Sequence, residues 1–140
     1  MVATRLSLFA TALWWGSLSI VGFMVVPMLF AHLGSPAVAG NMAARLFSAQ
    51  TWVALSCGLV LLMGFRSEWA LPSANRSFVA LFLIVFGMLL ALLSEFAVAP
   101  RIVARDNLRL WHSVGTVLYA LQWFSATVLL WRLGASSPAR

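Results

Sequence analysis

Four long apolar segments constrain the fold of this chain more than any other feature. They lie at Leu6–Ala31, Ala43–Phe65, Phe78–Ala99 and Trp111–Leu133. Each is close to the ~20 residues that an α-helix needs to cross the hydrocarbon of a bilayer, and none shows the strict alternation of a half-buried strand. Because only helices and closed barrels satisfy their backbone hydrogen bonds in lipid, the segments predict four transmembrane helices.

The composition also indicates a chain that lies in lipid. Hydrophobic residues make up 63% of the 140 residues and charged residues only 9%, whereas about 25% of a soluble domain is charged. A chain of this length forms one domain and cannot enclose so much apolar surface in water. The first segment is also longer than the ~7–15-residue core of a signal peptide, so we expect Leu6–Ala31 to be a retained span.

The links between the apolar segments are short and contain turn residues such as Gly34, Pro36 and Pro72. Short links make consecutive helices antiparallel neighbours. The sequence therefore predicts an all-α fold, an integral membrane up-down four-helix bundle that forms a single domain over residues 1–140. Small residues four positions apart favour close helix packing in lipid, and such pairs occur at Ala12/Gly16, Ala54/Gly58, Gly87/Ala91 and Thr116/Ala120.

The charge pattern is that of membrane loops. The formal net charge is +6, and the nine basic residues, all arginines, are spread mainly among the gaps between the apolar segments. This distribution predicts contact with anionic lipid headgroups and argues against nucleic acid. Counting the free amino terminus, it slightly favours both termini in the cytoplasm, in a bacterial inner membrane. The single cysteine, Cys57, lies in an apolar segment and is expected to be a packing residue.

Polar residues gather at one end of the predicted bundle. With four spans, the first and third links lie on the same side of the membrane. That side collects His32, Asn41, Arg45, Gln50, Glu95, Arg101, Arg105, Asp106, Arg109 and His112. From these we predict a ligand-binding polar cluster made of Arg45, Glu95, Arg101, Arg105 and His112.

Glu95 is the first candidate within this cluster, because it lies inside the third apolar segment. A carboxylate in lipid costs a few kcal/mol unless it is paired or neutral, and such residues commonly mark functional sites. Arg45 and His112 are the expected partners. Two interpretations remain open: a structural pairing between helices, and a role in binding a ligand or a proton.

A second candidate is a row of soft ligands on the first helix. Met24, Met28 and His32 are spaced by four residues and so share one helix face. Thioether and imidazole groups suit copper in its reduced state. The alternative is that the methionines fill space, as they commonly do in apolar cores.

The two histidines form a third candidate. His32 and His112 are expected at the same membrane level, where two imidazoles across a bundle can ligate a haem b iron, and arginines can hold the propionates. The alternative is that each is an interfacial hydrogen-bonding residue. Arg101, Arg105 and Arg109 would form one basic stripe for an anionic headgroup or a phosphate if residues 100–110 were helical. The alternative is that these arginines form a solvated loop face. No catalytic triad, phosphate loop or carboxylate pair is apparent, which argues against a hydrolase and against nucleotide binding.

Several short motifs resemble those of the transmembrane protein 205-like family. They are Trp15-Gly16-Ser17-Leu18, Pro27-Met28-Leu29-Phe30, Ala39-Gly40-Asn41-Met42-Ala43-Ala44-Arg45-Leu46-Phe47, Ala99-Pro100-Arg101-Ile102 and Leu110-Trp111-His112-Ser113. The resemblance covers most of the chain and implies a small four-helix membrane domain of undefined biochemistry.

Two other groups are similar more faintly. HemJ-type protoporphyrinogen oxidases, which are linked to b-type haem, have counterparts at Trp15, Pro27, Leu29, Phe30, His32, Met42, Arg45, Leu46 and Phe47. The chain departs from them because the spacing from Pro27 to the histidine differs by one residue and their Asn-Glu-x-Pro segment is missing near Pro100. CopD-type copper-resistance domains are similar in layout, which would fit the Met24, Met28 and His32 row.

Three functions follow from these observations. The leading one is a membrane protein that handles a small ligand or metal, or assists a membrane partner, through the polar cluster. The second is a HemJ-like haem enzyme that oxidises protoporphyrinogen. The third is a structural membrane subunit without a cofactor, in contact with a membrane-protein partner or a second copy of itself.

Overall fold

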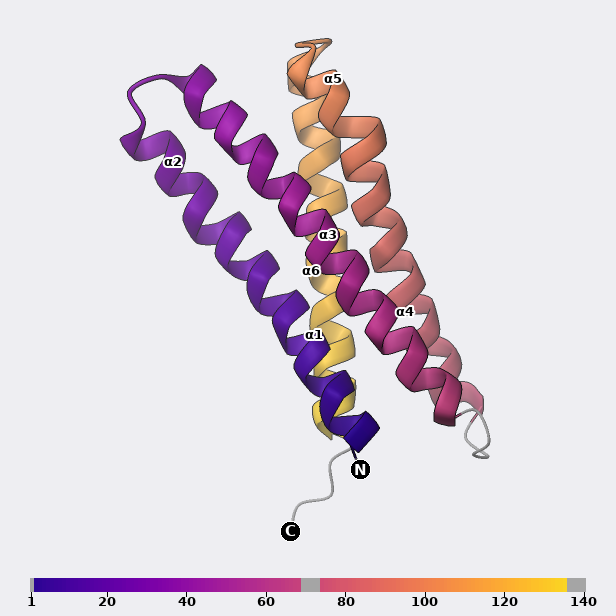
Figure 1. Cartoon of the computed structure of the whole chain (residues 1–140). Helices are drawn as coiled ribbons and strands as arrows, with labels where there is room; N and C mark the ends of the chain where they lie inside the picture. Colours follow the sequence, from indigo (N-terminus) through magenta and orange to yellow (C-terminus); the bar gives the residue numbers. More distant parts are fainter. Residues whose placement is uncertain (1, 69–73, 136–140) are drawn as a thin grey trace.

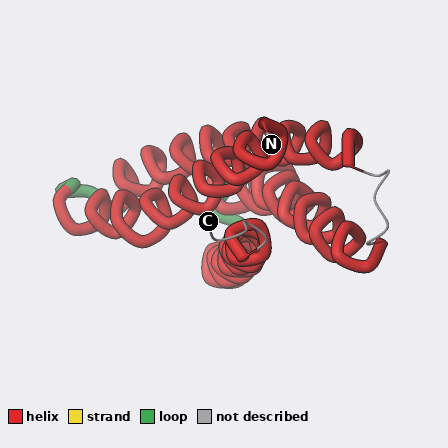
Figure 2. The backbone as a smooth tube through the Cα atoms, turned by 90° about the horizontal axis from the view of Figure 1, so that it is seen from below, coloured by secondary structure: helices red, strands yellow, loops and turns green. Residues whose placement is uncertain are grey.

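A computed structural model describes residues 2–68 and 74–135, and all the regular structure in these two ranges is helical. The helices are α1 (Val2–Ile20), η1 (Val21–Val25), α2 (Val26–His32), α3 (Pro36–Glu68), α4 (Ala74–Leu93), η2 (Ser94–Val98), α5 (Ala99–Val103) and α6 (Leu108–Ala135). The η elements are single π-helical turns inside longer helices. Figure 1 shows the order of the elements, and Figure 2 shows helices joined by short connections.

The predicted four membrane helices are confirmed. Four helices among the described residues are long and apolar enough to cross a membrane: Arg5–His32, Pro36–Gly64, Phe78–Val103 and Leu108–Ala135. Two boundaries differ from the sequence prediction by more than three residues. The second helix begins at Pro36 instead of Ala43, because a proline is well tolerated in the first turn, where its missing N–H has no partner to lose. The third continues through Pro100.

The helices pack in a ring. Helix α1 lies against α3 and α6, and α4 lies against the same two helices. Consecutive membrane helices are antiparallel, so the beginning of α1 and the end of α6 lie at one end of the bundle (Figure 1). The predicted all-α membrane bundle is therefore confirmed. We call the end that holds the α2–α3 and α5–α6 connections the loop end.

The core of the bundle combines large side chains with small ones. Trp14, Leu18, Leu61, Ile84 and Leu129 are completely or almost completely buried. Cys57 is buried among them, as predicted. The small pairs Ala54/Gly58 and Gly87/Ala91 are buried, as expected for contact points. The pairs Ala12/Gly16 and Thr116/Ala120 are not, because Ala12, Thr116 and Ala120 are exposed on the outer surface.

Two membrane helices contain a π turn followed by a proline. In η1 and η2 the N–H groups of Val26 and Ala99 bond to the carbonyls of Val21 and Ser94, five residues back. Each turn is followed by a short α-helix that carries a proline near its start, Pro27 or Pro100. The helices thus continue past prolines that would otherwise interrupt them.

These π turns reveal an internal repeat. The pairs Trp14/Gly87, Val21/Ser94 and Pro27/Pro100 are each separated by 73 residues. Burial repeats at the same spacing, since Ser7, Thr11, Trp14 and Leu18 of α1 correspond to Ala80, Ile84, Gly87 and Ala91 of α4, all of which are buried. Buried residues of α3 and α6 correspond at a spacing of 72 residues, as in Gln50/Gln122 and Ala54/Ala126. The chain therefore consists of two similar helical hairpins.

The two hairpins have the same direction. Helices α1 and α4 run the same way because each is antiparallel to α3 and α6. Such parallel repeats are related by an axis along the membrane normal. Trp14 and Gly87 occupy equivalent places in the two halves and touch each other, which locates the interface inside the bundle.

Candidate functional site

Glu95 lies on the π turn η2 and is partly buried. Its carboxylate accepts a hydrogen bond from the hydroxyl of Ser48 on α3. Among the described residues, neither Arg45 nor His112 forms an ion pair with it, although both were the expected partners. The sequence prediction thus identified the carboxylate but not its neighbour, a serine whose single hydroxyl gave no signal in an apolar segment.

The three arginines and the histidine of the predicted cluster lie at the loop end and are exposed. They are Arg45, Arg101, Arg105 and His112. The Arg101 guanidinium lies 4.5 Å from the centre of the Trp111 ring and also donates to the carbonyl of Ala97. It therefore ties α5 to the start of α6. The structure brings the cluster to one end of the bundle but does not gather it around Glu95.

The α5–α6 connection is a tight turn. Asp106 N–H bonds to the carbonyl of Arg101 at 3.0 Å, and Arg105 N–H bonds to that of Ile102 at 3.1 Å. This pattern is a Schellman motif, in which the residue at Arg105 takes a left-handed conformation, here with φ 56°. Because the helix ends at Val103, the stripe of Arg101, Arg105 and Arg109 expected for a continuous helix is not formed.

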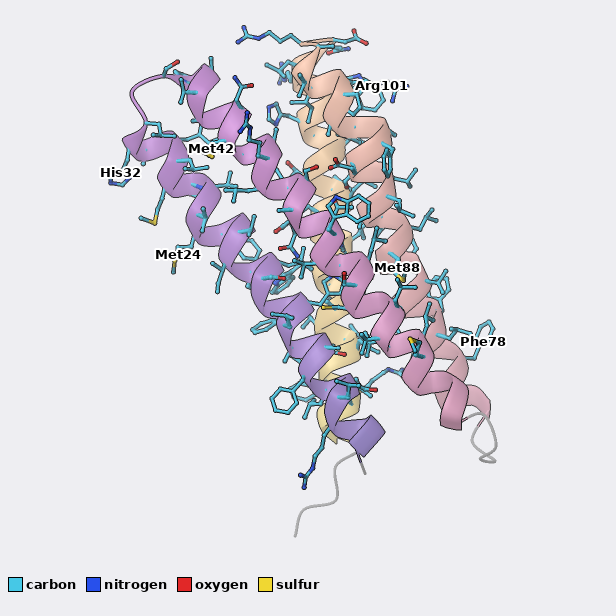
Figure 3. All side chains as sticks on the ribbon, viewed as in Figure 1. Met24, His32, Met42, Phe78, Met88 and Arg101 are labelled. Atoms are coloured by element: carbon cyan, nitrogen blue, oxygen red, sulfur yellow. The ribbon has the colours of Figure 1, made fainter. Side chains whose placement is uncertain are left out.

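The row of Met24, Met28 and His32 lies on the outside of the bundle. Both methionines are more than half exposed, at 57% and 53%, and His32 is exposed. In Figure 3, Met24 and His32 project from the outer edge of the first membrane helix, away from the other helices. The described residues contain no group of three or more His, Cys, Asp or Glu side chains that could hold a metal ion.

The two histidines do not face each other. The ring of His32 lies 3.0 Å, through Nδ1, from the Met28 carbonyl on its own helix, and α2 packs only against η1 and α3. His112 lies on α6 and is exposed. To ligate one haem iron, both imidazoles would have to face each other inside the bundle. In this arrangement they do not. Haem and copper therefore remain predictions from the sequence and its resemblances alone.

Inside the bundle, hydrogen bonds donated by side chains join neighbouring helices, and the sequence predicted few of them. Trp15 Nε1 donates to Thr127, Trp123 Nε1 to Ser19, Gln50 Nε2 to Ser17, and the Tyr119 hydroxyl to the Leu18 carbonyl, all at 2.8–2.9 Å. The clearest sequence signal was the pair of glutamines, Gln50 and Gln122, within apolar segments. Both are buried.

Within residues 2–68 and 74–135, three buried polar side-chain atoms have no hydrogen-bond partner. They are Trp14 Nε1, Ser94 Oγ and Gln122 Nε2. Buried polar groups without a partner are rare and call for a specific explanation. Ser94 directly precedes Glu95 on the same π turn, so the unpartnered hydroxyl and the intramembrane carboxylate belong to one region of the bundle.

The fold and this polar interior define a multi-pass α-helical membrane protein built from two similar hairpins. Residues 9–110 match a family described as a domain of unknown function, DUF4149. Because the match spans most of the chain, the protein belongs to this family. Comparison with curated proteins and with solved structures finds no match.

The family match covers α2 to α5 completely and ends at residue 110, near the start of α6. It includes Ser48, Ser94 and Glu95 but not Gln122. Its description names no activity and no link to the transmembrane protein 205-like, HemJ-type or CopD-type proteins. Those resemblances remain predictions.

Proposed function

We propose that this protein binds a small ligand inside the membrane, and that the ligand presents a positive charge or a hydrogen-bond donor to Glu95. The observation that carries the proposal is the environment of this carboxylate. It lies on the third membrane helix, is partly buried, and accepts one hydrogen bond, from Ser48.

A structural ion pair would predict a different environment. A charge held in lipid for helix packing alone is normally neutralised by an opposite charge on a neighbouring helix. The nearest expected cation, Arg45, is exposed and unpaired with Glu95 in the described part of the chain. One hydroxyl uses only one of the lone pairs of the carboxylate oxygens. The other lone pairs can accept hydrogen bonds from a ligand or contact a cation.

The arginines at the loop end have a different role in this proposal. Arg45 and Arg105 are exposed at the loop end, where they meet the polar surface of the bilayer. Arg101 holds α5 against α6 through Trp111. Together they orient the bundle in the membrane and position the π turn that carries Glu95, while the ligand enters from the loop end. With the termini in the cytoplasm of an inner membrane, that entrance faces away from the cytoplasm.

The test is ligand-dependent stability. The purified protein in lipid nanodiscs would be heated with sodium, potassium, ammonium or propylammonium chloride, with N-methylglucamine chloride replacing them to keep the ionic strength constant. A cation at ten times its Kd stabilises the folded state by about 1.4 kcal/mol, which raises the Tm by about 4 °C for a chain of this size. We expect at least one of these cations to do so.

The variants separate binding from general salt effects. Glu95→Gln keeps the size and removes the charge, so it should abolish the cation-dependent rise in Tm. Asp106→Asn removes an exposed acid in the turn and should leave the rise unchanged. If no cation stabilises the protein, or if Glu95→Gln responds like the natural chain, the carboxylate has no ligand role and the structural interpretation is preferred.

A further inference from the structure

The two glutamines occupy equivalent places in the two hairpins but have different neighbours. In the first hairpin, Gln50 Nε2 donates to Ser17 at 2.9 Å. The repeat places Gln122 where Gln50 lies, and it places Leu90 where Ser17 lies. Gln122 is only 3% exposed and its Nε2 has no partner. The second hairpin therefore contains the buried glutamine amide but not the serine hydroxyl that accepts its hydrogen bond in the first hairpin.

A second unpartnered group lies at nearly the same level. Gly115 of α6 packs against Val98 of η2, and α6 runs antiparallel to α4. Because the helices are antiparallel, the level of Ser94, four residues before Val98, corresponds to Tyr119 on α6, four residues after Gly115. Gln122 follows Tyr119 by three residues, so it lies within about one turn of Ser94 along the helix axis. The buried Ser94 Oγ lacks a partner too. Two orphaned groups, on neighbouring helices, thus lie next to the turn that carries Glu95.

We propose that an oxygen atom that is not part of the protein accepts hydrogen bonds from Gln122 Nε2 and the Ser94 hydroxyl, beside Glu95. The amide nitrogen can only donate, so the missing partner must be an acceptor. A bound water meets this need, as buried waters typically make about three hydrogen bonds to such groups. A hydroxyl or carbonyl oxygen of the ligand meets it equally, and only this second source rests on the proposed function.

Water would link the amide to the carboxylate and give Glu95 a hydrated connection inside the bundle. A ligand oxygen would make the site selective, because the same molecule would meet Glu95 with its cationic end and Gln122 with its oxygen. Either source fits the presence of leucine at position 90, where the first hairpin has Ser17. A serine at that position would itself accept the hydrogen bond of the Gln122 amide.

The experiment uses the two glutamine side-chain amides, because Gln50 and Gln122 are the only glutamines in the chain. Solid-state NMR of the ¹⁵N-labelled full-length protein in bilayers would measure magnetisation transfer from water to each amide. Gln122→Leu identifies the Gln122 signal by removing it. For a water ligand, we expect rapid transfer to Gln122 and at least several-fold slower transfer to Gln50, whose amide is already bonded.

A ligand oxygen is tested with ethanolamine and propylammonium, which differ only by a hydroxyl in place of a methyl group. Ethanolamine should bind at least ten-fold more tightly and move the Gln122 signal. Leu90→Ser supplies the amide with the partner that Gln50 has, so it should abolish either the water transfer or the ethanolamine preference while the protein stays folded.

The outcomes are distinct from those of the proposed function. If neither water transfer nor an ethanolamine preference is seen at Gln122, this inference is overturned, even where Glu95 still binds a simple cation. If water transfer is present and Leu90→Ser removes it, the inference stands although no cation binds. Equal water transfer to both amides, without an ethanolamine preference, would also overturn it.

Discussion

The indole ring of Trp14 fills the space beside Gly87. A Cβ atom built on Gly87 would lie 2.7 Å from Cη2 and 2.9 Å from Cζ2 of this completely buried tryptophan. We therefore expect Gly87→Ala to force the ring or helix α4 to move. Overpacking of this kind typically costs about 1–3 kcal/mol, and thermal unfolding in detergent or nanodiscs would measure it as a lower Tm.

Gly16 supplies the matched control, because a Cβ at that position meets nothing within 4 Å. Gly16→Ala should leave the Tm unchanged or raise it, since alanine is the better helix former by about 1 kcal/mol. If both substitutions lower the Tm equally, the contact between Trp14 and Gly87 does not determine the packing of the two hairpins.

Ser48 is the partner of Glu95, so its removal should weaken the attachment of α3 to η2. We expect Ser48→Ala to lower the free energy of unfolding by about 0.6 kcal/mol, the mean for hydrogen bonds between membrane helices, and by no more than about 1.7 kcal/mol. Ser113→Ala is the control, because the exposed Ser113 hydroxyl bonds only to the Arg109 carbonyl on its own helix. Equal stability of the two variants would argue against the contact with Glu95.

Arg105 has an unfavourable backbone conformation in the α5–α6 turn. Its φ of 56° is in the left-handed region, which costs a non-glycine residue roughly 1–2 kcal/mol. Arg105→Gly should therefore raise the free energy of unfolding by about 1 kcal/mol in detergent. Arg109→Gly, on α6, should not stabilise the protein. A destabilising effect of Arg105→Gly would show that the arginine side chain, and not the backbone, dominates at this turn.

The sequence was sufficient to predict the fold because the length of each apolar segment is an almost direct measure of membrane thickness. The same long helices give little information about the candidate site. Glu95 could be found because a carboxylate in an apolar segment is costly, whereas Ser48 could not, since one serine carries no comparable penalty. The expected pairing with Arg45 failed because side-chain reach on different helices depends on their rotation, which apolar patterns leave undetermined.

The repeat was hidden for a related reason. The two hairpins share burial and π turns, but few residue identities, with Pro27/Pro100 and Gln50/Gln122 among the clearest. In lipid, many apolar side chains fill equivalent positions, so repeats lose their sequence similarity while keeping their packing. The row of Met24, Met28 and His32 shows a different limit of sequence patterns. A regular spacing places residues on one helix face, but it does not say whether that face lies inside or outside the bundle.

The orientation is tested by labelling introduced cysteines. In a Cys57→Ser background, Arg5→Cys and Arg109→Cys place single exposed thiols at opposite ends of the bundle. With the termini in the cytoplasm, a membrane-impermeant maleimide added to intact bacterial cells should label Arg109→Cys, and Arg5→Cys only after lysis. The opposite pattern would reverse the orientation and place the entrance to the Glu95 site on the cytoplasmic side.

The haem and copper hypotheses are tested by the visible absorption spectrum and elemental analysis of the purified protein. His32 lies on the outer face of α2, which does not pack against α6, where His112 lies. We therefore expect no Soret band that depends on both histidines and no stoichiometric copper. A Soret band lost in both His32→Ala and His112→Ala would require α2 to move against α6. Copper that is lost in Met24→Ala, Met28→Ala and His32→Ala would instead assign the outer face of this helix as the metal site.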